Sequence, residues 1–303
     1  GKTGEKTEEK TAVIEIAKPA GLTLLSEEER NPLYTTTYGV GEVIKDAVRN
    51  GCRKFIVGIG GSATNDGGAG MLQALGFGLL KENGEQIPIG ARGLEELAEI
   101  TDDNVIPELA ECKFKIACDV TNVLCGETGA SAVYGPQKGA DEEMTERLDR
   151  LLFSYASLVK KKIPKADSMY PGTGAAGGLG FAFLTFMDAQ LESGIQIVIK
   201  ETGLEQEIAK ADLVITGEGR MDGQTAMGKA PIGIAKIAKK YGKPVIAFAG
   251  AAARDAGACN EQGIDAFFPI LREAVSLEAA MKRENAEANM EAAVEQAYRL
   301  WRL

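Results

Sequence analysis

The residues best suited to chemistry gather in one glycine-rich loop, "VGIGGSATNDGGAG", which covers residues 57–70. A buried strand is predicted directly before this loop and a helix directly after it. Ligands of parallel α/β sheets bind beyond the carboxyl ends of the strands, which is where such a loop lies. Its glycines let a ligand approach the backbone, and its other side chains supply hydroxyl, amide and carboxylate groups. We expect the backbone of residues 60–68 to hold a substrate carboxylate or a transferred phosphate, with these residues as the candidate contacts: Gly60, Gly61, Ser62, Thr64, Asn65, Gly67 and Gly68.

An alternative use of the same loop is dinucleotide binding. Gly58, Gly60 and Ala63 satisfy the loose pattern G-x-G-x-x-A, and Glu82 follows at about the distance expected of a ribose-binding acid. The carboxylate of Asp66 would, however, repel a pyrophosphate unless a cation lay between them. The loop therefore favours a magnesium-bound phosphate or a hydroxyl-bearing substrate, and an NAD-dependent oxidoreductase is the alternative enzyme. A further alternative is that the glycines merely permit close packing.

A second polar loop, "TGEGRMDGQTAMGKAP" over residues 216–231, also follows a predicted strand. Gly223, Gly228 and Lys229 match the pattern G-x-x-x-x-G-K, but Ala230 stands where a P-loop has the hydroxyl that binds Mg²⁺. The loop is therefore not a P-loop, although Lys229 could neutralise a phosphate. A solvated surface turn is the alternative. Two carboxylates of this loop are candidates to hold Mg²⁺ or to accept a proton: Glu218 and Asp222.

Two further stretches have residue types suited to binding an anionic substrate. In "ACDVTNVLCGETGASAVYGPQKGA", residues 117–140, Asp119 and Asn122 follow the end of a predicted strand, and Lys138 lies in a tight turn. Asp119 is equally well explained as the cap of a turn or helix. In "GTGAAGG", the pattern G-x-G-x-x-G lacks a preceding strand, so it predicts an anion cradle at the start of a helix. The glycines of that pattern are Gly172, Gly174 and Gly177.

The composition excludes several classes of mechanism. The 303 residues include no histidine, which rules out Ser-His-Asp and Cys-His catalysis and histidine-ligated metals. Acid–base chemistry falls to Asp, Glu, Lys or Tyr, and a metal would be a hard cation such as Mg²⁺. The net charge of -10 argues against a general nucleic-acid binder.

Cysteine usage and hydropathy bear on the compartment. The five cysteines are an odd number and form no C-x-x-C pair, which indicates a reducing cytoplasm and not a disulfide framework. The sequence has no run of about 18 apolar residues, so it predicts no membrane span. We therefore expect a cytoplasmic protein that acts on small molecules and binds neither nucleic acid nor membrane.

The elements that must position these loops alternate between strands and helices, which predicts a largely parallel α/β fold. The length favours two lobes, and the pattern changes near Lys200, so we expect one lobe over residues 1–200 and another over residues 201–303. Residues 1–10 are polar and predict a loop. Predicted helices include residues 181–191 and one closing helix over 276–301, capped by Ser276. Predicted strands cover residues 11–17, 54–60, 114–120, 194–200, 212–219, 244–250 and 265–270.

Five longer motifs, taken together and in order, resemble the glycerate kinase family, the type that phosphorylates D-glycerate at its 2-hydroxyl. They are "RNPLYTTTYGVGE", "GIGGSATNDGGAGMLQALG", "ACDVTNVLCGETGASAVYGPQKGA", "GTGAAGGLG" and "ADLVITGEGRMDGQTAMGKAPIG". The resemblance runs from about Lys10 to the C-terminus. It implies ATP and Mg²⁺ as cofactors, 2-phosphoglycerate as product, and two α/β lobes with the active site in the cleft between them.

The resemblance also carries expectations for the second lobe. One lobe of the family is flavodoxin-like and is built from both chain ends, and family members have a further N-terminal segment that this sequence does not show. We therefore expect the flavodoxin-like parallel-sheet lobe to be incomplete at its N-terminal part. Because that segment would complete the active site, a non-catalytic fragment or ligand-binding module is an alternative to an active kinase. A homodimer is a candidate assembly.

Three residues are predicted to take part in catalysis. Asp66 or Asp222 would hold the substrate hydroxyl or Mg²⁺, and Lys229 would neutralise phosphate charge. Arg220, in the same motif as Lys229, is expected to contact phosphate. We also expect Asp66 and Lys229 to face each other across the lobes. Asp66→Asn should then slow the reaction by orders of magnitude with little change in folding.

Overall fold

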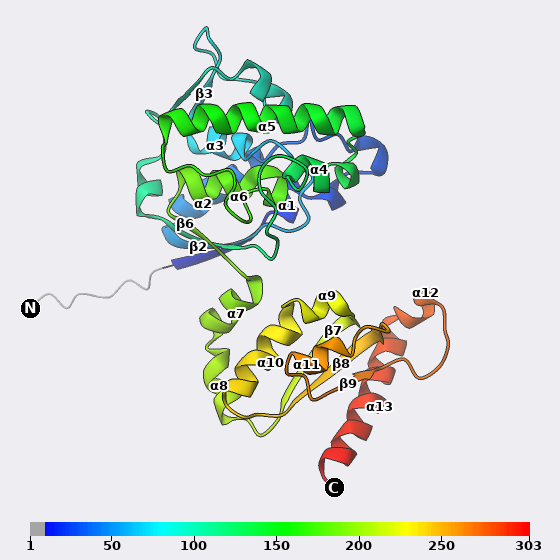
Figure 1. Cartoon of the computed structure of the whole chain (residues 1–303). Coiled ribbons are helices and arrows are strands. Elements are labelled where there is room, and N and C mark those ends of the chain that lie inside the picture. The colour runs from blue at the N-terminus through cyan, green and yellow to red at the C-terminus, as the bar shows by residue number, and fades with distance from the viewer. Residues whose placement is uncertain (1–9) are drawn as a thin grey trace, which may run out of the picture. The chain divides into compact units, whose positions relative to one another are not determined.

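The chain folds into two compact units in this computed structural model, which describes residues 10–303 (Figure 1). The first unit ends at Ser193 and the second runs from Gly194 to Leu303. The boundary expected at residue 200 falls inside helix α7 (Gly194–Thr202). The polar loop expected over residues 1–10 lies, apart from Lys10, outside the described residues.

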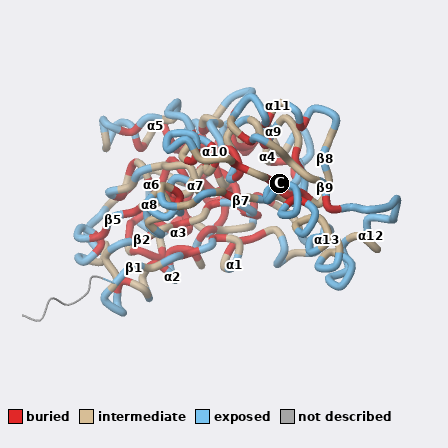
Figure 2. Tube along the Cα trace, turned by 90° about the horizontal axis from the view of Figure 1, so that it is seen from below, coloured by how far each residue is buried: buried red, intermediate tan, exposed pale blue. Residues whose placement is uncertain are grey.

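The sheet of the first unit has four parallel strands, in this order: β1 (Lys10–Glu15), β2 (Cys52–Gly58), β5 (Lys113–Ala117) and β6 (Ala189–Glu192). One face of the sheet is buried, since Phe55, Val57, Phe114 and Ile116 are at most 2% exposed. The rings of Phe55 and Phe114 stack with their centroids 4.6 Å apart. Buried residues of this unit gather on β2, β5 and the helices beside them (Figure 2). Because parallel strands end at one edge, the loops after β2 and β5 are neighbours.

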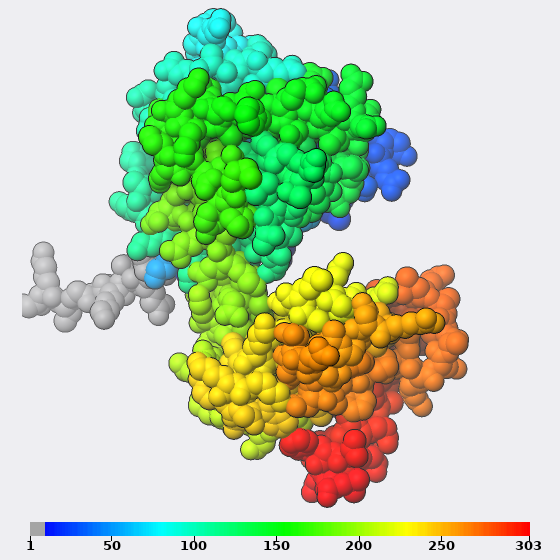
Figure 3. Space-filling model, viewed as in Figure 1, coloured from blue at the N-terminus to red at the C-terminus, as the bar shows by residue number. Residues whose placement is uncertain are grey.

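The helices of the first unit are α1 (Ala17–Ala20), α2 (Tyr38–Arg49), α3 (Ala69–Leu75), α4 (Ala130–Tyr134), α5 (Glu142–Lys162) and α6 (Ala175–Phe186). Helix α5 lies at the surface of the unit (Figure 3). Asp141 is its N-cap, because the Asp141 carboxylate accepts a hydrogen bond from the Met144 N–H at 2.8 Å. Its buried stripe, which includes Leu148, Leu152 and Tyr155, belongs to the same core as the sheet.

A small antiparallel pair, β3 (Gly78–Leu80) and β4 (Glu99–Thr101), also belongs to the first unit. A turn follows β3, with Gly84 in a left-handed conformation at φ 83°. Short 3₁₀ helices cover Leu22–Leu24, Glu27–Glu29, Ala91–Glu96, Pro107–Glu111 and Pro136–Lys138.

The second unit has a three-stranded parallel sheet in the order β7 (Val214–Met221), β8 (Val245–Ala252) and β9 (Ala266–Pro269). The strands expected at these positions are therefore confirmed. Its core is built from one face of β7 and β8 together with buried helix residues such as Ile208, Ile232 and Ala235. The helices are α7, α8 (Leu204–Lys210), α9 (Gly223–Ala226), α10 (Ala230–Lys240), α11 (Ala258–Glu261), α12 (Leu277–Ala280) and α13 (Arg283–Trp301).

The segment "GIQIVIK", residues 194–200, is helical, so the predicted strand is wrong. Its β-branched residues favour a strand locally. Burial decides otherwise: Ile197 and Ile199 are 2% and 3% exposed. Ile195 also packs against Gly233 of α10, where a Cβ would lie 2.8 Å from the isoleucine side chain. Packing between helices thus overrides a weak local preference.

Two other helix predictions are wrong in extent. The helix expected over residues 181–191 ends at Phe186, because residues 189–192 form β6 and pair with β5. The single closing helix expected over residues 276–301 is two helices, with Lys282 as the N-cap of α13. Ser276 caps α12 as predicted, since its Oγ accepts from the Ala279 N–H at 3.2 Å.

The five cysteines carry free thiols, as their number and spacing predict. Within residues 10–303, no helix combines the length and the apolar character needed to cross a bilayer.

Candidate active site

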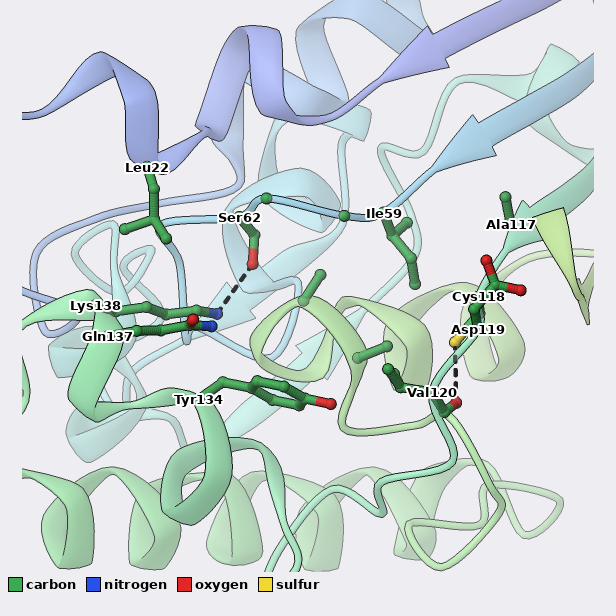
Figure 4. Close-up of a pocket in the computed structure, with 14 residues that line it drawn as sticks. Leu22, Ile59, Ser62, Ala117, Cys118, Asp119, Val120, Tyr134, Gln137 and Lys138 are labelled. Carbon is green, nitrogen blue, oxygen red and sulfur yellow. Dashed lines mark hydrogen bonds between the residues drawn. The ribbon is translucent and has the colours of Figure 1, made fainter. Parts of the chain in front are cut away.

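A cavity of about 380 Å³ opens at the edge of the first sheet where β2 and β5 end (Figure 4). This volume falls within the range of small-molecule sites. The loop after β2 contributes Gly60, Gly61 and Ser62, and the loop after β5 contributes Asp119. Both loops thus lie at the carboxyl edge of the sheet, as expected. Other walls come from α4, the turn that follows it and the start of α6: Tyr134, Gln137, Lys138, Ala175 and Ala176.

Lys138 places a buried amine in the wall of this cavity. The residue is 2% exposed, and its Nζ donates to Ser62 Oγ at 2.9 Å and to the Thr64 carbonyl oxygen at 2.6 Å. Gly139 shapes the turn, because its φ of 94° and its contact with a neighbouring backbone carbonyl leave no room for a side chain. Burial lowers the pKa of Lys138 to about 7, and the negative charge of Asp66 acts in the opposite direction. The lysine therefore changes its charge near neutral pH.

Asp119 and Cys118 lie across the cavity from Lys138 and Ser62, and the Tyr134 ring points between the two sides (Figure 4). Asp119 is exposed, so its carboxylate is within reach of a ligand in the cavity. Burial raises the pKa of the Cys118 thiol, which keeps it neutral. The cavity therefore presents a cation on one side and a carboxylate on the other.

Asn122, another predicted site residue, supports the cavity and is not part of its lining. Its Oδ1 accepts a hydrogen bond from Tyr134 Oη at 2.6 Å, and its Nδ2 donates to the Thr128 carbonyl oxygen at 2.9 Å. Both polar atoms of the Asn122 amide are therefore hydrogen-bonded to residues of the segment 117–140. Asn122 is thus placed to orient Tyr134, and direct substrate binding by Asn122 stays a prediction.

Asp66 lies behind the cavity wall, fully buried and not among the lining residues. Its Oδ2 accepts from the Thr37 N–H at 2.8 Å, Thr37 Oγ1 at 2.9 Å, the Gly70 N–H at 3.2 Å and Thr36 Oγ1 at 3.4 Å, and its Oδ1 accepts from the Gly68 N–H at 3.1 Å. Burial raises the pKa of the Asp66 carboxyl, and the hydrogen bonds from Thr37, Gly70 and Gly68 act against that rise. Because both oxygens are occupied within the protein, the predicted catalytic role of Asp66 is not supported by this geometry.

The later glycines of the first loop are explained by packing. Gly67 and Gly68 have left-handed φ values of 63° and 80°, and a Cβ on Gly68 would lie 2.4 Å from Ala182 Cβ of α6. Their N–H groups are also occupied, by the Gly177 carbonyl oxygen and by Asp66. Only the first part of the loop therefore faces the cavity. Two other predicted residues are buried and do not line it: Thr64 and Asn65.

Gly68→Ala is expected to destabilise the protein by about 3 kcal/mol, because a methyl group there meets Ala182 and the backbone is left-handed. Thermal unfolding measures the change. Gly60→Ala is the matched control, since a Cβ on Gly60 has no neighbour within 4 Å. Equal stability of the two variants would contradict the packing explanation.

The second glycine run contributes to the cavity through Ala175 and Ala176. Among residues 10–303, Ala176 is the one non-glycine residue with a left-handed backbone, at φ 53°. Such a conformation costs on the order of 1 kcal/mol, and residues that adopt it cluster at functional sites. Gly174 and Gly177 pack closely instead, since a Cβ would lie 2.1 Å and 2.0 Å, respectively, from a backbone carbonyl oxygen. Phosphate binding by these two glycines stays a prediction.

The dinucleotide alternative lacks the geometry it requires. Its pattern opens a helix, but α3 begins only at Ala69, well beyond Ala63. Glu82 is exposed and follows β3, which pairs antiparallel with β4 in a separate sheet. A ribose-binding acid belongs after the next strand of the same parallel sheet. These residues therefore do not form a dinucleotide site.

A second polar cluster lies in the second unit at the end of β7. Lys229 Nζ lies 3.6 Å from Glu218 Oε1, and Arg220 Nε lies 4.0 Å from Asp222 Oδ2. Asp222 caps α9 by accepting from two backbone N–H groups at 3.0 and 3.1 Å, and the bond from Thr225 lowers its pKa. Glu218 Oε2 is buried without a hydrogen-bond partner. The structure thus brings together the four residues that were predicted in this loop.

The magnesium site predicted at Glu218 and Asp222 is not a closed cage. In the part of the chain that the structure describes, no three His, Cys, Asp or Glu side chains are grouped so that they could hold an ion. Mg²⁺ usually keeps water and phosphate oxygens as ligands beside one or two carboxylates. Two half-buried carboxylates, one of which has an oxygen without a hydrogen-bond partner, fit a magnesium ion that would take its other ligands from phosphates and water.

Sequence reasoning missed several residues that line the cavity, among them Tyr134, Gln137 and Ala176. These three stand inside the long motifs, and Gln137 lies in the same 3₁₀ turn as Lys138, with Tyr134 shortly before it. The signal was their position in the same short segment as a predicted site residue. Residue type alone did not distinguish them from surface positions.

The chain is similar in sequence and structure to known glycerate kinases. The glycerate kinase family matches residues 2–302. The glycerate kinase of Halalkalibacterium halodurans is 49% identical over 280 residues, covering 92% of this chain and 74% of that protein. The glycerate 2-kinase of Escherichia coli is 49% identical over 273 residues, covering 90% and 72%. The crystal structure of a Salmonella typhimurium LT2 protein named "putative glycerate kinase 2" matches with a TM-score of 0.83 and 47% identity, covering 95% of this chain and 75% of that one. With its parallel sheets and the polar loops at their edges, the chain belongs to the glycerate kinase family.

Proposed function

We propose that this protein transfers the γ-phosphoryl group of ATP to the 2-hydroxyl of D-glycerate, forming 2-phosphoglycerate and ADP. The observation that carries the proposal is the buried amine of Lys138 in the wall of a cavity at the carboxyl edge of the sheet. A protonated amine held away from water attracts a carboxylate strongly. The choice of the acid and of the position of transfer is supported by relatives that bear the names glycerate kinase and glycerate 2-kinase.

The substrate acid is proposed to bind with its carboxylate toward Lys138 and Ser62. These two side chains hydrogen-bond each other at 2.9 Å, so the lysine is already oriented before substrate arrives. Gly60 and Gly61 border the same region without side chains, which lets the acid approach the backbone. A cavity of about 380 Å³ leaves room for a three-carbon acid and a transferred phosphoryl group.

Asp119 is proposed to orient the substrate hydroxyl and to accept its proton. It is the carboxylate among the residues that line the cavity, and it lies across from Lys138 (Figure 4). The hydroxyl oxygen then forms a bond to the γ-phosphorus while the bond from that phosphorus to the bridging oxygen breaks and ADP leaves. Positioning and charge neutralisation supply most of the rate in such transfers. Asp119 therefore takes the role that was expected of Asp66.

The second polar cluster is proposed to bind the phosphates of ATP and the Mg²⁺ that accompanies them. Its members are Glu218, Arg220, Asp222 and Lys229. The two cations would neutralise phosphate charge, as predicted from the sequence. Glu218 and Asp222 would hold Mg²⁺, which neutralises charge on the phosphates when it is bound. The lowered pKa of the Asp222 carboxyl suits a ligand of a cation better than a general base at neutral pH.

The free thiols support a cytoplasmic location for the protein.

The test is phosphorus NMR of a reaction containing the protein, ATP, Mg²⁺ and D-glycerate, with a parallel assay that contains NAD. We expect 2-phosphoglycerate and ADP in the first reaction and no change of NAD in the second. Formation of 3-phosphoglycerate would correct the position of transfer. Calorimetric binding of ATP and D-glycerate without any product would instead favour the ligand-binding module.

A further inference from the structure

Three consecutive threonines, Thr35 to Thr37, bind the loop that carries Ser62 although they are not part of the proposed site. Thr35 Oγ1 donates to the Ala63 carbonyl oxygen at 2.8 Å. Thr37 donates twice to Asp66 Oδ2, from its N–H at 2.8 Å and from its Oγ1 at 2.9 Å. These bonds attach both ends of residues 63–66 to the segment that leads into α2.

The Thr37 hydroxyl does not cap its own helix, although Thr37 stands at the N-cap position. Thr37 is the N-cap of α2, where a threonine oxygen ordinarily accepts from an N–H of its own helix, yet it makes no such bond. It is fully buried, and its oxygen accepts from the Met71 N–H of α3 at 2.9 Å while it donates to Asp66. One hydroxyl thus ties the starts of α2 and α3 to the Asp66 carboxylate. Its loss would leave buried polar groups short of a partner.

The opposite side of the same loop binds Lys138. The two acceptors of its Nζ are Ser62 Oγ and the Thr64 carbonyl oxygen, at 2.9 and 2.6 Å. The threonine contacts at Ala63 and Asp66 alternate along the chain with these lysine contacts. A shift of the loop on the threonine side therefore moves both acceptors on the lysine side.

We propose that Thr35–Thr37 position Lys138 for the substrate carboxylate, with Thr37 as the main positioning residue. The kinetic consequence rests on the proposed function, but the structural consequence does not. A loosened loop would admit water to Nζ, and water weakens the attraction between an ammonium group and a carboxylate. The titratable groups around Lys138 are Asp66 behind the loop and three residues of the cavity: Cys118, Asp119 and Tyr134.

Thr37→Val removes the hydroxyl and keeps the shape of the side chain, whereas Thr37→Ser keeps the hydroxyl. NMR of protein containing ¹³C-labelled lysine gives the titration midpoint of Lys138, and Lys138→Met assigns its signal. In Thr37→Val we expect the midpoint to rise by about one pH unit, because burial is the main cause that lowers it. Thr37→Ser should keep the parent midpoint. So should the control Thr202→Val, which removes a hydroxyl bonded to a carbonyl within α7.

The kinetic measurement separates positioning from loss of stability. In Thr37→Val, KM for D-glycerate is expected to rise about tenfold while KM for ATP stays within about twofold. Partial unfolding would reduce the amount of active protein and leave KM unchanged. If Thr37→Val does not fold, Thr35→Val, which removes the bond to Ala63, is tested for the same changes.

An unchanged or lower Lys138 midpoint in the folded valine variant would overturn the proposal. An equal rise of KM in Thr37→Ser would overturn it as well, because the serine keeps the hydroxyl. If the parent protein does not phosphorylate D-glycerate, the proposed function fails, and the Lys138 midpoint still decides whether the threonines position the lysine.

Discussion

Lys138→Met is expected to lower kcat/KM for D-glycerate by about a thousandfold, because it removes the buried cation from the cavity and keeps most of the side-chain volume. The amine is 2% exposed, so water does not replace it once it is gone. Folding should survive, since an apolar side chain is often tolerated where a buried charge was held. Steady-state kinetics with product detection, together with thermal unfolding, gives both results.

The pH profile provides a second measure of the same residue. The pKa of Lys138 is lowered to about 7, so the free enzyme loses the ammonium group as the pH rises through that value. Since kcat/KM reports ionisations of the free enzyme, it should fall above about pH 7 in the parent and lack this fall in Lys138→Met. The free energy of unfolding follows the opposite trend. Above about pH 7 the lysine binds more protons in the unfolded state than in the folded state. Its contribution therefore makes the free energy of unfolding rise with pH until the pH reaches the ordinary pKa of lysine.

Lys161→Met is the matched control, because Lys161 is exposed on α5 and lies outside the cavity. It should retain the parent's kcat/KM and pH profile. Activity near the parent value in a folded Lys138→Met protein would show that another group binds the acid. A parent profile that is flat across neutral pH would show that the protonation state of Lys138 does not limit substrate binding.

The place of the cavity could be predicted from the sequence, because it depends on local pattern. A buried strand followed by a glycine-rich loop is recognisable over a few residues, and parallel strands end at a common edge. That reasoning placed Gly60, Ser62 and Asp119 at one edge of a sheet, where the structure has them. The same local reasoning failed for "GIQIVIK", where contacts with α10 and not β-branched composition decide the structure.

The environments of Lys138 and Asp66 could not be predicted, because they depend on contacts between distant residues. Lys138 is joined to Ser62 across 76 positions, and nothing in the turn "GPQKGA" indicates that its lysine is buried. Asp66 resembles a ligand-binding carboxylate by type and by its glycine neighbours. Its bonds to Thr37, 29 positions away, give it a structural environment instead. Composition alone cannot separate a carboxylate that faces a substrate from one that faces backbone N–H groups.

Asp66→Asn is expected to destabilise the protein by about 3 kcal/mol, contrary to the small effect on folding that the sequence suggested. Five groups donate hydrogen bonds to the Asp66 carboxylate, and none of them accepts one from it. The amide of asparagine carries two hydrogens of its own, so at either oxygen position it would face at least one backbone N–H. With Nδ2 in place of Oδ1 it meets Gly68, and in place of Oδ2 it meets Thr37 and Gly70. Each orientation leaves a buried donor without an acceptor.

Thermal unfolding distinguishes this structural role of Asp66 from the catalytic one predicted from the sequence. A loss of about 3 kcal/mol corresponds to a fall in Tm of about 10 °C for a domain of this size. Asp103→Asn, at an exposed aspartate, is the matched control and should keep the parent Tm. At a temperature where Asp66→Asn remains folded, its kcat should stay within about tenfold of the parent, because the carboxylate does not line the cavity. A parent-like Tm combined with a loss of several orders of magnitude in kcat would instead establish that the Asp66 charge acts on the reacting groups.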